Sequence, residues 1–162
     1  MMFQTYGNRN HPAVLFFHAM GVTGASSEPV AKYLQDRYFC ILPTSTVYCK
    51  GQKYVSKADE VRQVEEYLKS QGVERLELVV ASSIGADLAK ELQKHMYFEF
   101  GSIEDHFKYR QAVMEAYPCG NYPVFEGYDH MQYQIRDPKG FAEMLTHIIE
   151  HDGMPKLPVV RK

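Results

Sequence analysis

The chain lacks several features that would assign it to a specialised class of protein. It has no tryptophan and only three cysteines, Cys40, Cys49 and Cys119. Three scattered cysteines give neither a disulfide framework nor the spacing of a metal site, which favours a reduced, cytoplasmic protein without a metal. Because the formal net charge is only −2, no basic surface indicates nucleic acid as a partner.

Long apolar runs and targeting patterns are also missing. No run approaches the roughly 18 apolar residues of a membrane-spanning helix, so no membrane span is expected. The first ten residues, MMFQTYGNRN, lack the basic-then-apolar order of a secretory signal peptide. A flavodoxin-like binding domain is the weakest alternative, because no glycine-rich loop is present to cradle a phosphate. We therefore expect a cytoplasmic protein without a cofactor.

The chain instead has the composition and patterning of a globular α/β protein. Apolar residues make up 45% and charged residues 23% of its 162 positions, which suits one domain with a substantial core. Short apolar segments alternate with amphipathic ones. Strands are expected at 2–6, 13–18, 38–42, 76–81, 96–100 and 123–125, with helices starting at 26 or 27 and covering 56–71, 84–94, 107–117 and 137–149.

This alternation predicts an α/β fold, a three-layer sandwich with a mostly parallel sheet of about five to six strands. We expect the second apolar strand to stop at Pro43. Residues 1–150 are expected to form the single domain, and residues 151–162 a Pro-containing C-terminal tail. In such sheets the chemistry collects at the carboxyl ends of the strands.

The segment around Ser83 is the most informative part of the chain. An apolar run ends at Val80, Ala81 lies two residues before Ser83, and Gly85 lies two residues after it. Small residues on both sides permit a sharp strand-to-helix turn, because a larger side chain there would clash with neighbouring backbone. A hydroxyl at its apex would lie at a helix N-terminus, where developing negative charge is favoured. Ser83 could alternatively be a simple helix cap.

An acid and a base follow Ser83 in the order that nucleophilic catalysis requires. Glu104 and Asp105 come just after the fourth apolar strand, and His130 follows the fifth. A serine hydroxyl is a poor nucleophile unless an imidazole accepts its proton and a carboxylate fixes that imidazole's tautomer. His130 could alternatively be an ordinary surface histidine.

These motifs resemble the α/β-hydrolase family over roughly residues 2–150. Residues 81–85, ASSIG, are similar to its nucleophile elbow, with Ala81 in place of the usual glycine. Residues 17–21, FHAMG, resemble its oxyanion loop, with Ala19 where glycine is common. The resemblance implies that the backbone N–H groups of Met20 and Ile84 bind the oxyanion.

The same resemblance implies a catalytic triad of Ser83, His130 and an acid. Glu104 is the first choice for the acid, because it follows Gly101 by three residues, and Asp105 is the second. His18, which lies in the oxyanion loop, is more often a structural residue than a base.

One departure from the family pattern is the short distance between elbow and acid. Ser83 and Glu104 are only 21 positions apart, whereas family members place another strand, another helix and often a lid there. We therefore expect a shortened form without the lid and one strand–helix unit. Its site should be open, and the acid strand should lie one strand spacing, about 4.8 Å, nearer the serine strand.

The sequence thus predicts a serine hydrolase that cleaves small acyl esters through an acyl-enzyme. The alternative is a catalytically impaired, lidless scaffold or a self-associating binding protein. In that case apolar surface left by the missing lid would favour a homodimer.

Overall fold

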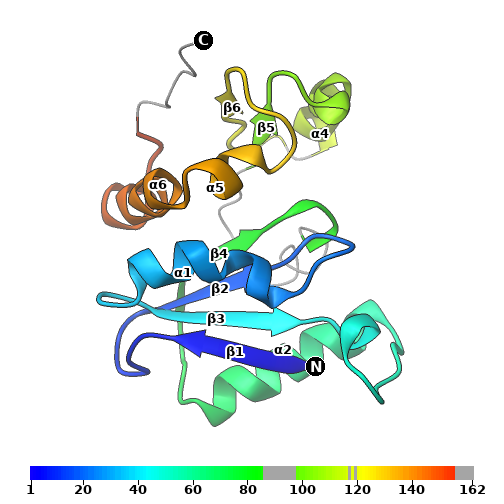
Figure 1. The fold of residues 1–162 in the computed structure, drawn as a ribbon, viewed down its shortest axis with the longest axis vertical. Helices are drawn as coiled ribbons and strands as arrows, with labels where there is room; N and C mark the ends of the chain where they lie inside the picture. The colour runs from blue at the N-terminus through cyan, green and yellow to red at the C-terminus, as the bar shows by residue number, and fades with distance from the viewer. Residues whose placement is uncertain (86–97, 117, 119, 156–162) are drawn as a thin grey trace. The chain divides into compact units, whose positions relative to one another are not determined.

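The computed structural model describes residues 1–85, 98–116, 118 and 120–155. The chain forms two compact units, residues 1–93 and residues 94–162, and each is described by itself (Figure 1). The prediction of a single domain over residues 1–150 stays a prediction. The expected elbow helix, 84–94, and the start of the expected strand at 96 fall mostly outside the described residues.

The first unit is built on a four-stranded sheet, β1 (Met2–Tyr6), β2 (Ala13–Phe17), β3 (Phe39–Thr44) and β4 (Leu76–Ala81). The strand order is β1-β3-β2-β4. Strand β2 runs parallel to both β3 and β4, and β1 pairs with β3 in the antiparallel sense. All residues of β2 and β3 are buried, which explains their continuous apolar sequence. The expected mostly parallel sheet is confirmed.

Strand β3 corrects one expectation, because it continues through Pro43 to Thr44 instead of stopping at the proline. Pairing between β2 and β3 extends only as far as Leu15 opposite Ile41. At Pro43 the strand therefore has a partner on one side only, where Phe3 of β1 lies opposite it. A proline, which has no N–H to donate, is tolerated where one side of a strand is unpaired.

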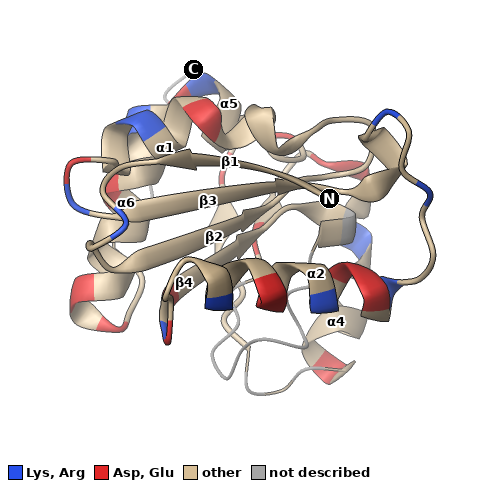
Figure 2. Cartoon of the chain, turned by 90° about the horizontal axis from the view of Figure 1, so that it is seen from below, with Lys and Arg blue, Asp and Glu red and all other residues tan. Residues whose placement is uncertain are grey.

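Two helices cover opposite faces of this sheet, as Figure 2 shows, and complete the three expected layers. They are α1 (Glu28–Leu34), which follows the 3-10 turn η1 (Gly24–Ser27), and α2 (Lys57–Ser70), which follows η2 (Thr46–Tyr48). Side chains alternate between the two faces along a strand. The core beneath α2 consists of every second residue of β2 and β3 together with two helix residues, namely Ala13, Leu15, Phe17, Phe39, Ile41, Val64 and Leu68.

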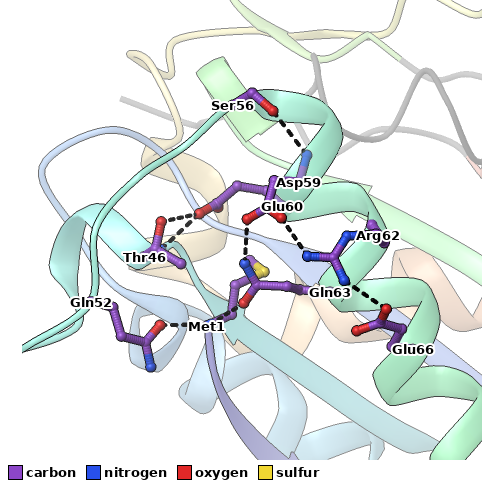
Figure 3. Close-up of polar contacts among 9 residues, drawn as sticks. All are labelled: Met1, Thr46, Gln52, Ser56, Asp59, Glu60, Arg62, Gln63 and Glu66. Atoms are coloured by element: carbon purple, nitrogen blue, oxygen red, sulfur yellow. Dashed lines mark hydrogen bonds and ion pairs between the residues drawn. The ribbon is translucent and has the colours of Figure 1, made fainter.

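The expected cap of α2 is present, because the Ser56 hydroxyl accepts a hydrogen bond from the Asp59 N–H group at 3.1 Å. On the exposed side of the helix, the Arg62 guanidinium contacts Asp59 at 2.5 Å and Glu66 at 2.6 Å (Figure 3). Such solvated pairs contribute little to stability. The buried face of α2 therefore holds it in place.

The second unit contains a two-stranded parallel sheet, β5 (Phe100–Gly101) and β6 (Val124–Phe125). The six expected strands are thus divided between two sheets. The helical elements are η4 (Asp105–Tyr109), α4 (Arg110–Ala116), α5 (Gln132–Arg136) and α6 (Pro138–His151). Asp137 caps α6 as expected, because its carboxylate accepts a hydrogen bond from the Gly140 N–H group at 2.8 Å.

An aromatic cluster joins β6, α5 and α6. The Tyr133 ring centroid lies 4.8 Å from that of Phe125 and 5.7 Å from that of Phe141. Burial, with a smaller contribution from Asp137, raises the pKa of Tyr133 to about 12, so its hydroxyl stays neutral at physiological pH. The cluster fixes the loop before α5 to the last helix.

The described residues contain neither a membrane-spanning helix nor a cluster of metal ligands. None of their helices is long and apolar enough to cross a membrane. No group of three or more histidine, cysteine, aspartate or glutamate side chains among them could hold a metal ion.

Cys40, in the central strand β3, provides a test of the packing in the core of the first unit. Cys40 is fully buried, and burial raises the pKa of its thiol to about 12. At pH 8 only about one Cys40 thiol in ten thousand would be ionised to the reactive thiolate, and burial would keep the reagent away from it. We expect iodoacetamide to leave Cys40 unmodified in the native protein and to alkylate it in urea, as read by peptide mass spectrometry. Rapid alkylation of the native protein would contradict this packing.

Candidate active site

The turn after β4 is sharp and holds Ser83 in a strained conformation. Ser83 has a φ of 52°, in the left-handed region that residues with a side chain rarely adopt, and it is exposed. The 3-10 turn η3 (Ser83–Gly85) begins at this residue. Strain of this kind persists only where the surrounding structure fixes it.

The end of β2 fixes the elbow. Phe17 and Ala81 are paired in the parallel register, and the Phe17 carbonyl accepts a hydrogen bond from the Ser82 N–H group at 2.9 Å. A Cβ atom on Gly85 would lie 2.9 Å from the carbonyl oxygens of both Phe17 and His18. The glycine is therefore required by close contact with the backbone of the neighbouring strand.

His18 holds the loop after β2 to the loop after β3. Its Nδ1 atom lies 2.7 Å from the Ala19 carbonyl oxygen, and its Nε2 atom lies 3.0 Å from the Ser45 N–H nitrogen. A carbonyl can only accept and an N–H group can only donate, so Nδ1 carries the proton and Nε2 accepts. Because both ring nitrogens are occupied, His18 has a structural role rather than that of a base.

A second contact to this loop comes from Tyr48. Its hydroxyl accepts a hydrogen bond from the Gly21 N–H group at 2.6 Å, and its ring meets that of His18 edge to face at 5.5 Å. The N–H group of Met20 lies between these two anchored positions and has no hydrogen-bond partner among the residues that the structure describes. It is thus available to an incoming oxyanion.

In the second unit, Glu104 and His130 form a close pair. Glu104 Oε2 lies 2.6 Å from His130 Nδ1, and the Glu104 side chain is only 2% exposed, against 38% for His130. A carboxylate can only accept, so Nδ1–H donates to it and Nε2 keeps its lone pair. A histidine held in this tautomer can act as a base through Nε2.

Backbone contacts fix the loop that carries His130 to the loop that carries Glu104. The Tyr128 carbonyl accepts from the Ile103 N–H group at 3.2 Å, and the Ser102 hydroxyl accepts from the Gly127 N–H group at 2.8 Å. A Cβ atom on Gly101 would lie 2.2 Å from the Tyr128 carbonyl oxygen. Glycine at position 101 thus lets the two loops approach.

The structure distributes the expected site residues over the two units. Ser83, Met20 and Ile84 belong to the first, and Glu104 and His130 belong to the second. Glu104 contacts His130, whereas Asp105 is exposed at the start of η4. Sequence reasoning missed the contribution of Tyr48, and no local pattern marks it.

Solved structures resemble this chain although their sequences differ from it. A marine microorganism esterase is 11% identical, with a TM-score of 0.71 over 90% of this chain and 98% of its own. An α/β hydrolase from the metagenome of sediments of the lagoon of Mar Chica, Morocco, is 13% identical, with a TM-score of 0.71 over 93% of this chain and 95% of its own.

A thioesterase domain from the curacin biosynthetic pathway is 11% identical, with a TM-score of 0.72 over 89% of this chain and 94% of its own. This chain has the α/β-hydrolase fold. No family model and no curated protein sequence matches it.

The close contact at Gly85 can be tested by a substitution that adds one methyl group. We expect Gly85→Ala to lower the free energy of unfolding in urea by about 1–3 kcal/mol, because the added Cβ atom overlaps strand backbone that cannot move aside cheaply. Gly153→Ala is the matched control, since the nearest atom to its Cβ would be 3.8 Å away. Equal effects of the two substitutions would show that Gly85 is not under close contact.

Proposed function

We propose that this protein is a serine hydrolase that cleaves small carboxylic esters. The single observation that carries the proposal is the 2.6 Å contact between the buried Glu104 carboxylate and His130 Nδ1, which leaves Nε2 as a base. The exposed, left-handed Ser83 supplies the nucleophile that such a base would activate. The esterase and thioesterase among the similar structures agree with acyl transfer as the chemistry.

In the proposed mechanism, Ser83 Oγ attacks the ester carbonyl carbon while His130 Nε2 accepts the hydroxyl proton. The N–H groups of Met20 and Ile84 stabilise the negative oxygen of the tetrahedral intermediate. His130 then gives the proton to the departing alcohol, and an acyl-enzyme remains on Ser83. Water, activated by the same histidine, releases the carboxylic acid and restores the serine.

The nucleophile can be tested by covalent labelling. We expect a fluorophosphonate probe to modify the protein at one site and Ser83→Ala to abolish that modification, as measured by intact-protein mass spectrometry. Ser82→Ala is the matched control and should still be labelled. A folded protein that is not labelled, and that hydrolyses p-nitrophenyl acetate no faster than Ser83→Ala, would favour the catalytically impaired scaffold instead.

The choice of acid can be tested by paired amide substitutions. Glu104→Gln should lower kcat for p-nitrophenyl acetate by about a thousandfold or more, because an amide no longer stabilises the imidazolium or fixes its tautomer. Asp105→Asn removes a neighbouring charge and should leave kcat within about twofold. A larger loss for Asp105→Asn than for Glu104→Gln would reverse the assignment of the acid.

A further inference from the structure

A cavity of about 360 Å³ lies within the first unit beside the candidate oxyanion loop. Its walls come from the carboxyl ends of β2 and β3, from the start of α2 and from the elbow glycine, Gly85. This volume lies within the range of about 300–1,000 Å³ found for small-molecule sites. Because both Met20 and Gly85 line it, the cavity opens beside the elbow and the oxyanion loop.

The buried polar residues in the cavity wall, His18 and Glu60, are already hydrogen-bonded, and the exposed Lys57 also lines the cavity. Both nitrogens of His18 are used by the backbone of Ala19 and Ser45. The buried Glu60 carboxylate accepts hydrogen bonds from the N–H group of Thr46, at 2.9 Å, and from its hydroxyl (Figure 3). A polar group entering the cavity would lose its hydration and gain few new partners, which is unfavourable.

Apolar side chains around the cavity are exposed to an unusual degree. Met20 is 72%, Val47 60% and Tyr54 45% exposed, and all three line it. Large apolar side chains gathered at one concave place commonly mark a ligand site. An apolar group bound in the cavity would contact them and remove part of this surface from water.

We propose that this cavity binds the aliphatic group of the ester substrate, so that the preferred esters carry a short to medium unbranched chain. This proposal rests on the proposed function only in taking an ester as the substrate. The binding of an aliphatic group is argued from the cavity wall alone. The chain can come from the acyl part or from the alcohol part, and the experiment below separates these two sources.

Binding can be measured without catalysis in the Ser83→Ala protein. Hexanoate stands for the acyl part and 1-hexanol for the alcohol part, and each is titrated while backbone amide NMR shifts are followed. We expect at least one of them to perturb residues 17–21 and 45–48. If only hexanoate does so, the cavity takes the acyl chain, and if only hexanol does so, it takes the alcohol. Absence of perturbation there by both compounds would overturn the proposal.

A tryptophan at the rim should obstruct the cavity. In the Ser83→Ala protein, we expect Val47→Trp to weaken the binding of whichever compound binds, hexanoate or 1-hexanol, by about tenfold or more. Val55→Trp is the matched control, because Val55 is 71% exposed and does not line the cavity. Equal affinity in the two tryptophan variants would contradict the assignment. A second pair, Tyr54→Ala with Tyr33→Ala as its exposed control, tests another residue of the cavity wall in the same way.

The two proposals fail in different ways. If hexanoate binds as expected but the Ser83 protein hydrolyses no ester, the hydrolase proposal fails and the aliphatic site stands. If p-nitrophenyl esters are hydrolysed, but neither hexanoate nor 1-hexanol perturbs residues 17–21 and 45–48 of the Ser83→Ala protein, the hydrolase proposal stands and the aliphatic site fails.

Discussion

The parallel pairing of β2 with β4 is the constraint on which the first unit's chemistry depends. It brings the last residues of the two strands side by side, so that the loop after β2 and the turn after β4 leave the sheet together. The Ser82 N–H group then bonds to the Phe17 carbonyl, and Gly85 lies against the same strand. Ser83 and the loop that carries Met20 thus follow neighbouring strand ends because of backbone pairing rather than side-chain contacts.

Each half of the candidate site is stabilised by its own contacts. Hydrogen bonds among the loops after β5 and β6 set the Glu104–His130 pair, and bonds among the ends of β2, β3 and β4 set the elbow and its neighbouring loop. Preorganisation of this kind matters because a catalytic group gains its effect from being held before the substrate arrives. Glu104 is almost fully buried and holds the more exposed His130 ring through its Nδ1 atom.

Local features of the sequence were sufficient to predict much of this structure. Ser56 and Asp137 identified two helix starts, continuous apolar runs identified β2 and β3, and the spacing of Ala81, Ser83 and Gly85 identified a sharp turn after β4. The remaining features depend on partners distant in the chain. Whether a strand ends at Pro43 depends on where β2 stops pairing, and the division of six strands into two sheets depends on long-range pairing. No local pattern contains that information.

The ring of His18 has a consequence for what this position can accept. It joins an acceptor carbonyl on one side to a donor amide on the other, through two nitrogens of fixed separation on one flat ring. This position therefore requires a side chain that can donate on one side and accept on the other. Lysine, which only donates, would leave the Ser45 N–H group without its acceptor, and a carboxylate, which only accepts, would have no hydrogen to offer the Ala19 carbonyl.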